Sequence, residues 1–165
     1  MKIFSISAMI LLSAGFLLAQ SHVTSVSNEA LAAAGGGPAP STAIPPNPSQ
    51  QQAVQQNVKD VHFDFNRADL RPDDQATLQS DAQWLKANPN TLVTIEGDAD
   101  ERGDIVYNVV LSDKRAEVTK DALLSMGVPA DQIVYATGWG KLYPICSEAD
   151  ESCWSQNRRA HFAAW

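Results

Sequence analysis

The chain has 165 residues, 44% of them hydrophobic, which is typical of one globular domain with some additional sequence. Twelve lysine and arginine residues stand against nineteen aspartate and glutamate residues, giving a formal net charge of −7. Proteins that bind nucleic acids carry a basic surface, as do proteins that bind anionic membrane surfaces, so this balance argues against both classes.

The first residues have the pattern of an export signal. Lys2 provides a positive start, and an apolar stretch over residues 3–19 is followed by small and polar residues. We expect cleavage after Ser21, which makes residues 1–21 a signal peptide. The alternative is an uncleaved membrane anchor, because the apolar stretch is near the lower limit of about 17–25 residues for a membrane span. Lipid attachment after export needs a cysteine near this point, whereas the first cysteine is Cys146.

Residues 22–57 have the composition of a linker. Alanine, glycine and proline dominate residues 32–48, and glutamine dominates residues 50–56, without the period of a helix or a strand. We expect a flexible tether here, with a short helix over residues 51–58 as the alternative.

Residues 58–165 predict one compact unit in which strands alternate with helices. Alternating residues predict a strand over 61–65, and Pro72 predicts the start of a helix that Asp69 caps and that ends near Asn88. The elements expected after it are a strand over 91–96, an acidic turn over 97–103, a helix over 105–126 stopped by Gly127, a strand over 133–137, a turn over 138–140, a loop containing both cysteines, and a strand over 159–164. This order predicts an α/β (α+β) sandwich with helices packed on one face of a sheet.

Cys146 and Cys153 are the only cysteines of the chain. An even number of cysteines in an exported protein favours a disulfide. Two free thiols, or half of a metal site, are the alternatives. Zinc is disfavoured because the sequence offers no paired histidines and no second pair of cysteines.

The helix predicted over residues 105–126 carries an arginine within its apolar stripe. At 100° per residue, Arg115 shares that stripe with Leu111, and Asn108 lies one heptad before it. A buried charge without a partner is strongly disfavoured, so something must satisfy Arg115. One explanation is an internal ion pair, and the other is a ligand carboxylate held by the guanidinium fork. The internal candidates are Asp100, Glu96 and Asp98. With Asp100 on the neighbouring turn, the two charges could hold a small zwitterion.

Other functions fit the acidic turn poorly. It begins like a calcium loop, but Arg102 takes the place of the third ligand and Val109 that of the last. Glycoside hydrolysis needs two carboxylates on opposite sides of a cleft, whereas these acidic residues follow each other in one short stretch. The sequence also lacks a recognisable nucleophile and histidine set, so we expect a protein that is not an enzyme.

The acidic turn and four later motifs resemble the OmpA-like peptidoglycan-binding domain over residues 58–165. The matching residues are Glu96 to Gly103 with position 98 left open (E-G-x-A-D-E-R-G), Tyr107-Asn108, Leu111-Ser112, Arg115-Ala116 and Asn157-Arg158-Arg159. Within that family the D-E-R-G and Y-N motifs are most similar to the peptidoglycan-associated lipoproteins, whose lipid-bearing cysteine has no counterpart here. The resemblance implies a βαβαβ-type domain with a four-stranded mixed sheet.

By resemblance, the domain binds peptidoglycan non-covalently through the diaminopimelate residue of the stem peptide and so links the protein to the cell wall. Asp100 would bind the ammonium and Arg115 the carboxylate. The residues that would complete the site are Asn108, Leu111, Asn66 and Arg158, with Arg159 as a structural neighbour. Asn66 stands where the family often has aspartate, and Asp98 where it often has histidine or asparagine, which predicts a more acidic pocket rim.

The resemblance also implies a location in the periplasm or at the outer membrane and protein partners of the Tol-Pal type, without nucleic acid and without a cofactor. Two alternatives stay open. One is an inner-membrane protein that keeps its signal segment as an anchor and uses the same domain. The other is a periplasmic protein-interaction module that does not bind peptidoglycan.

Overall fold

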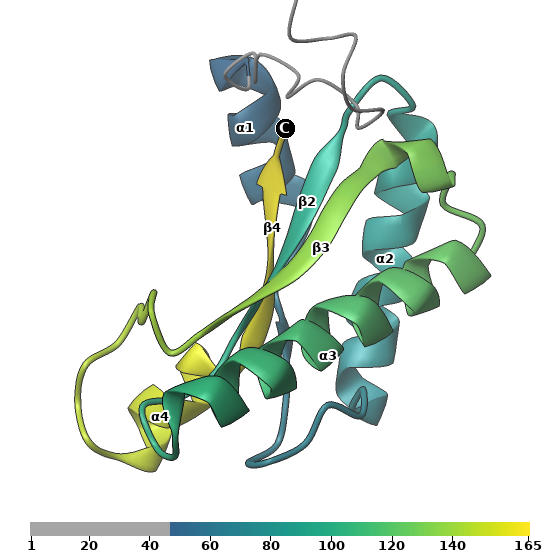
Figure 1. Cartoon of the computed structure of the whole chain (residues 1–165). Coiled ribbons are helices and arrows are strands. Elements are labelled where there is room, and N and C mark those ends of the chain that lie inside the picture. The colour runs from purple at the N-terminus through teal and green to yellow at the C-terminus, as the bar shows by residue number, and fades with distance from the viewer. Residues whose placement is uncertain (1–46) are drawn as a thin grey trace, which may run out of the picture. The chain divides into compact units, whose positions relative to one another are not determined.

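The computed structural model describes residues 47–165; the expected signal peptide and most of the expected linker lie outside the described residues. Four strands form one sheet in the order β1 (Val61–His62), β4 (Arg159–Ala164), β2 (Val93–Asp98) and β3 (Ile133–Gly140) (Figure 1). The sheet is mixed, because β2 runs parallel to β3 and antiparallel to β4.

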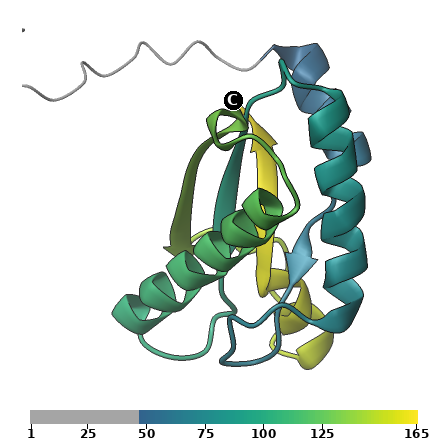
Figure 2. The same ribbon diagram turned by 90° about the vertical axis from the view of Figure 1, so that its right-hand side faces the viewer.

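Two long helices cover one side of this sheet, namely α2 (Pro72–Ala87) and α3 (Ile105–Ser125) (Figure 2). Ile95 and Phe162 face them from neighbouring strands, and Leu78, Leu85 and Leu123 pack against the sheet from the helices. The α+β fold with a four-stranded mixed sheet is therefore confirmed. Over residues 47–165, no helix combines the length and the apolar character that a bilayer span requires.

Helix α1 (Pro48–Asn57) lies within the stretch that was expected to be linker. Asn47 caps it by accepting a hydrogen bond from the Ser49 N–H, and proline stands in its first turn, as is common at helix starts. Val54 is fully buried and joins the core together with Val58. The folded part thus begins before residue 58. The alternative prediction was a short helix over residues 51–58, and the structure has a helix that begins three residues earlier and ends at Asn57.

Three further elements differ from the expectation. Strand β1 stops at His62 instead of residue 65, because the chain turns away to form a loop in which Asn66 has a positive φ of 59°. Strand β3 continues through the expected turn to Gly140, still paired with β2. Helix α2 has Arg71 at its N-cap position without a side-chain cap, while Asp69 pairs with Arg67 instead.

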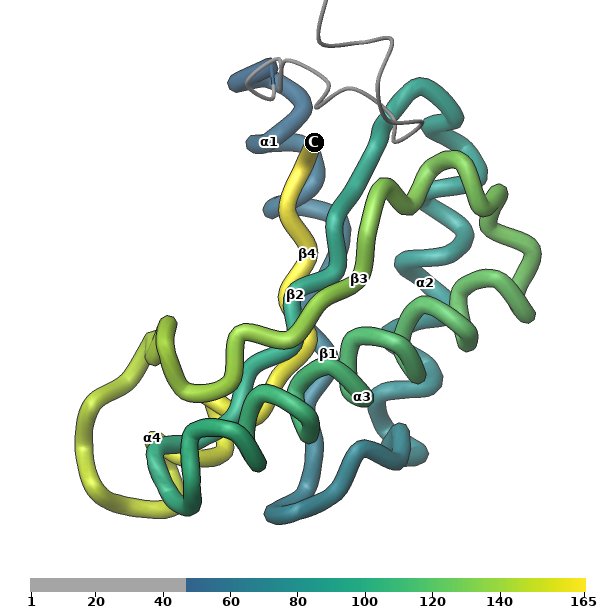
Figure 3. The backbone as a smooth tube through the Cα atoms, viewed as in Figure 1, coloured from purple at the N-terminus to yellow at the C-terminus, as the bar shows by residue number. Residues whose placement is uncertain are grey.

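The segment between the cysteines and β4 contains a short helix, α4 (Glu151–Asn157), that was expected to be loop. Asp150 caps it by accepting a hydrogen bond from the Cys153 N–H at 3.0 Å. Figure 3 shows that α4, the start of α3 and the loop after β1 gather at the same end of the sheet. The candidate site lies at this end.

Helix α3 approaches the sheet very closely, and two glycines make the approach possible. A Cβ atom on Gly97 would lie 1.9 Å from the carbonyl oxygen of Ser112, and one on Gly138 would lie 2.2 Å from the Asp113 nitrogen. Real Cβ atoms do not come this close to other atoms, so both positions require glycine. The helix side that faces the strands is formed by small residues such as Ser112 and Ala116, both fully buried.

Candidate binding site

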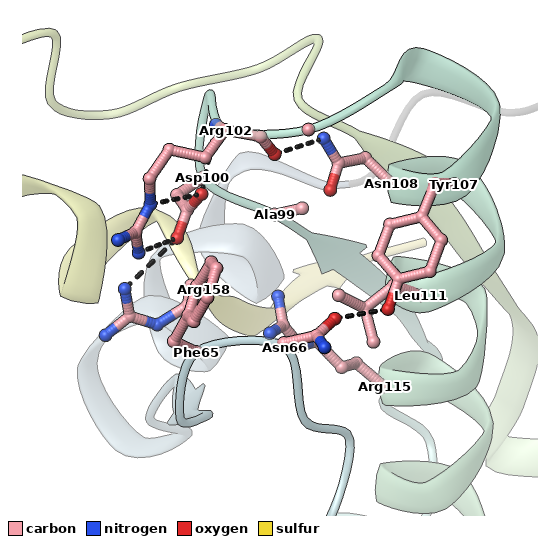
Figure 4. Close-up of a pocket in the computed structure, with 11 residues that line it drawn as sticks. Phe65, Asn66, Ala99, Asp100, Arg102, Tyr107, Asn108, Leu111, Arg115 and Arg158 are labelled. Atoms are coloured by element: carbon pink, nitrogen blue, oxygen red, sulfur yellow. Dashed lines mark hydrogen bonds and ion pairs between the residues drawn. The ribbon is translucent and has the colours of Figure 1, made fainter.

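A small pocket of about 80 Å³ opens between the loop after β1, the turn after β2 and the first turns of α3 (Figure 4). The six ligand-binding residues proposed from the sequence all line it: Asn66, Asp100, Asn108, Leu111, Arg115 and Arg158. Five further residues line the pocket without a role predicted from the sequence, namely Phe65, Ala99, Arg102, Gly103 and Tyr107. Phe65 directly precedes Asn66, and the other four belong to the motifs shared with the OmpA-like domain. Their position next to predicted site residues is the sequence signal that could have identified them.

Arg115 is fully buried at the floor of the pocket, and backbone carbonyls hold its guanidinium. Nε donates to the Arg67 oxygen at 2.9 Å, Nη1 to the Asp98 oxygen at 2.7 Å and Nη2 to the Asp64 oxygen at 3.2 Å. Burial lowers the pKa of Arg115 to about 10, and the nearby positive charge of Arg158 acts in the same direction. The internal ion pair considered above is therefore not what the structure shows.

Asp100 follows β2 and is also buried, with 4% of its surface exposed. It accepts hydrogen bonds from the side chains of Arg102 and Arg158, with Arg158 Nη1 at 3.1 Å (Figure 4). Burial alone would raise the pKa of Asp100, but the hydrogen bonds from Arg102 and Arg158 outweigh it and hold the pKa below its ordinary value. Asp100 is thus an anion at neutral pH.

Arg102 and helix α4 form the outer wall of the site. The Arg102 guanidinium lies 4.0 Å from the ring centre of Phe65 and 4.0 Å from that of Trp154. Its hydrogen bond to Asp100 raises the pKa of Arg102 above its ordinary value. Glu151, on α4, pairs with Arg158 and lies 3.6 Å from Arg102. In this wall each arginine side chain therefore lies beside a carboxylate, and Arg102 also contacts two aromatic rings.

Three residues hold the two sides of the pocket in place. The Asn108 amide donates to the Arg102 carbonyl at 2.9 Å and so ties the start of α3 to the acidic turn. Tyr107 donates its hydroxyl proton to the Asn66 side chain and connects α3 to the loop after β1. Asn66 adopts a left-handed conformation, which asparagine tolerates better than most residues.

Asp98 does not make the pocket rim acidic, contrary to the expectation. Side chains alternate along β2, and the Asp98 carboxylate lies on the sheet face opposite the helices, where it pairs with Arg159 at 2.8 Å. Arg159 also contacts Asp60 at 3.3 Å. Only the main-chain carbonyl of Asp98 reaches the site, through Arg115. Of the two adjacent arginines, Arg158 therefore lines the pocket and Arg159 belongs to the other face.

Cys146 and Cys153 form a disulfide, which confirms that prediction. Asn157, at the end of α4, accepts from the Ile145 and Cys146 N–H groups and donates to the Cys146 carbonyl at 2.7 Å. The disulfide and Asn157 together fasten α4 to the preceding loop. Over residues 47–165, no group of three or more histidine, cysteine, aspartate or glutamate residues is arranged to hold a metal ion.

The model of the OmpA family matches residues 62–158. The chain belongs to the OmpA family. This OmpA-family chain is 47% identical over 114 residues to a peptidoglycan-associated lipoprotein of Agrobacterium fabrum, covering 68% of this chain and 64% of the relative. It is 42% identical over 114 residues to one of Brucella melitensis, covering 68% of this chain and 67% of that protein. The chain thus spans slightly less than two thirds of the first relative.

Solved structures agree with this assignment. The crystal structure of the peptidoglycan-associated lipoprotein from Burkholderia pseudomallei superposes with a TM-score of 0.62 at 40% identity, over 65% of this chain and 90% of that one. The C-terminal domain of MotB from Helicobacter pylori superposes with a TM-score of 0.61 at 15% identity, over 66% of this chain and 84% of that one. The second match, at this low identity, shows the OmpA-family fold alone.

Proposed function

We propose that this domain binds peptidoglycan non-covalently in the cell envelope, with the free amino-acid end of diaminopimelate in the pocket. The observation that supports the proposal most strongly is the buried and unneutralised charge of Arg115. In the described part of the chain its hydrogen-bond partners are neutral carbonyls, so its charge is buried without a paired carboxylate. A ligand carboxylate would neutralise that charge in a site shielded from water, where ion pairs are strong.

The size and charge of the pocket support the same ligand. A pocket of about 80 Å³ is small, and it has room for an end group such as an ammonium and a carboxylate on one carbon. Asp100 supplies the anion for the ammonium, and Arg115 supplies the cation for the carboxylate. The aliphatic side chain of Leu111 provides apolar contact between them.

The relatives support the wider setting of the proposal. Those named above are called peptidoglycan-associated lipoproteins. The match to the OmpA family spans residues 62–158, which include all residues that line the pocket. We propose that this protein is exported to the periplasm or the outer membrane, binds the cell wall there and contributes to envelope integrity, with partners of the Tol-Pal type. Sequencing the N-terminus of the mature protein tests cleavage after Ser21 against retention of an inner-membrane anchor.

Sedimentation with purified sacculi tests the binding itself. The wild-type protein should sediment with sacculi that contain diaminopimelate, whereas D100A and R115M should lose about 10–100-fold in affinity, since each removes a charged hydrogen-bonding partner. Sacculi with lysine in place of diaminopimelate keep the amine but lack the carboxylate, so they should bind weakly. R67A and D69A are the matched controls, because Arg67 and Asp69 form an exposed ion pair with 61% and 74% of their side chains accessible.

Two results would contradict the proposal. The wild-type protein could stay in the supernatant, or D100A and R115M could sediment as the wild type does while their thermal unfolding shows that they are folded. Equal binding to the lysine-containing sacculi would remove the role of Arg115 as the carboxylate ligand.

A second candidate function, binding of a partner protein, is favoured by the exposed apolar residues at the start of α3. Ile105, Val106 and Val110 have 59%, 71% and 52% of their surfaces exposed beside the pocket. The double variant I105S/V106S separates the two functions. It should leave sacculus binding unchanged, and a loss of envelope integrity in cells that carry it would support protein binding.

A further inference from the structure

The acceptor positions of Asp100 are all occupied in the structure. Oδ1 accepts from the Arg102 main-chain N–H and from Arg102 Nε, both at 3.1 Å. Oδ2 accepts from Arg102 Nη2 at 2.6 Å and from Arg158 Nη1 at 3.1 Å. A carboxylate offers about four acceptor positions. An ammonium group that is to bind Asp100 must therefore displace one of these donors.

Arg158 is held too firmly to leave. Its side chain is 6% exposed, Nε donates to the Phe63 carbonyl at 2.9 Å, and Nη2 pairs with Glu151. Moving Arg158 would break its contacts with Phe63, Glu151 and Asp100. A buried cation would then be left without partners, which is strongly disfavoured. The Arg102 N–H is also fixed, because it belongs to the backbone of the turn that Asn108 holds.

The side chain of Arg102 is the donor that can move. It is 29% exposed, and its charged partners are Asp100 and, at 3.6 Å, Glu151. The guanidinium lies between the rings of Phe65 and Trp154, which attract a cation over their whole faces. It can leave Asp100 and approach Glu151, whose side chain is 62% exposed, without losing the aromatic contacts.

We propose that Arg102 is an internal counter-ion of Asp100 that the ammonium group of the ligand replaces. In the empty site the guanidinium occupies the subsite of the ammonium, and on binding it transfers to Glu151. Arg102 thereby determines specificity: a ligand without an amine leaves the Arg102–Asp100 pair intact, while a ligand with an amine must open it. This inference rests on the proposed function, because it requires that a zwitterionic end group enters the pocket.

Calorimetry with two peptides tests the inference on the full-length mature protein. The first peptide is L-alanyl-γ-D-glutamyl-meso-diaminopimelate, and the second carries 2-aminopimelate, which keeps the side-chain carboxylate but lacks the side-chain amine. R102M removes the donors and still fills the space between the two rings. R67M is the matched control, since Arg67 is exposed and its side chain contacts Asp69 outside the pocket.

R102M should bind the diaminopimelate peptide about three- to tenfold more tightly than the wild type, because the ligand no longer has to break a partly exposed ion pair. Its affinity for the aminopimelate peptide should be unchanged, and R67M should behave as the wild type with both. R102K keeps a charge but lacks the planar fork, so it should show a smaller increase for the diaminopimelate peptide alone. If R102M does not fold, the affinity of R102K for the two peptides is the test of the inference.

The inference is overturned if removing the guanidinium leaves the affinity for the diaminopimelate peptide unchanged or lowers it, or if both peptides gain equally. Lower affinity for both peptides would mean that Arg102 supports Asp100 in its binding position. Failure of the proposed function looks different, since the wild type would then bind neither peptide, and this inference would fall with it.

Discussion

The close contact between α3 and β2 gives a sharp prediction for Gly97→Ala. The added Cβ would lie 1.9 Å from the Ser112 carbonyl oxygen, whereas a carbon and an oxygen in contact are about 3.3 Å apart. Helix and strand would therefore have to separate by about 1.4 Å. Backbone atoms limit both sides of this contact, so no rotamer change can relieve it. We expect the free energy of unfolding to fall by at least about 3 kcal/mol, at the upper end of the usual cost of overpacking.

The same displacement should impair binding. Helix α3 carries Asn108 and Arg115, while Asp100 follows β2, so separating the two elements changes the distance between the anion and the cation. A misplacement of about 1 Å can strongly weaken a site that depends on fixed geometry, so we expect an affinity loss of at least about tenfold for the diaminopimelate peptide. The assays are urea denaturation followed by tryptophan fluorescence, and calorimetry at a temperature at which the variant is folded.

Gly127→Ala is the control for the loss of a glycine as such. Gly127 ends α3 with a positive φ of 84°, but a Cβ there would meet only the Lys86 side chain, at 4.0 Å. The cost should be about 1 kcal/mol, from the left-handed conformation alone, and ligand affinity should stay at the wild-type level. The reasoning is refuted if G97A is as stable as G127A, or if G97A is strongly destabilised and still binds the peptide as the wild type does.

Two further predictions concern stability. Burial raises the pKa of Asp81 to about 7, so the folded state holds a proton that the unfolded state releases, and stability should fall as the pH rises from about 4 to about 7. D81N should remove roughly 2–4 kcal/mol of this pH dependence in denaturant titrations, and an identical pH profile in both proteins would contradict the assignment. Replacing Cys146 and Cys153 by serine should lower the free energy of unfolding by about 2.5 kcal/mol and weaken peptide binding, because α4 carries Glu151 and Trp154. Destabilisation without any change in affinity would show that the disulfide does not support the pocket.

Much of the fold could be predicted from the sequence, because the residues that start and stop the longest helices lie next to those helices in the chain. Helix α3 begins at Ile105, as predicted, after Asp104, which accepts a hydrogen bond from the Val106 N–H. It ends at Ser125, one residue before the predicted end, and Gly127 follows with a positive φ. The elements that differ depend on contacts distant in the chain. Helix α1 has one fully buried side chain, Val54, which becomes visible as a core residue only when β4 is beside it. Helix α4 was missed for a different reason, because its contacts with Asp150 and the disulfide are local but the helix is too short to show a periodic pattern.

The candidate site shows the same limit. A charged residue in an apolar stripe pointed to Arg115, and the neighbouring acidic turn pointed to Asp100, because both signals are local. The sheet face on which the Asp98 side chain lies depends on the alternation of side chains along β2, and therefore on where this strand begins and ends. The role of Arg102 depends on Trp154, which is distant in the chain and belongs to the helix that was not predicted.

Arg115 was expected to be satisfied either by an internal ion pair or by a ligand, but in the structure backbone carbonyls hold its guanidinium. Hydrogen bonding and charge neutralisation are separate requirements of a buried cation, and the three carbonyls meet the first without meeting the second. This arrangement fixes the position of the guanidinium, and its charge would still be available to a ligand carboxylate. Asp100 is arranged in the opposite way, since its charge is neutralised by arginines, one of which can move. The carboxylate end of a zwitterion would therefore bind to a prepared cation, while its ammonium end would have to exchange with Arg102. Selectivity for the amine should therefore depend on Arg102, and affinity for the carboxylate on Arg115.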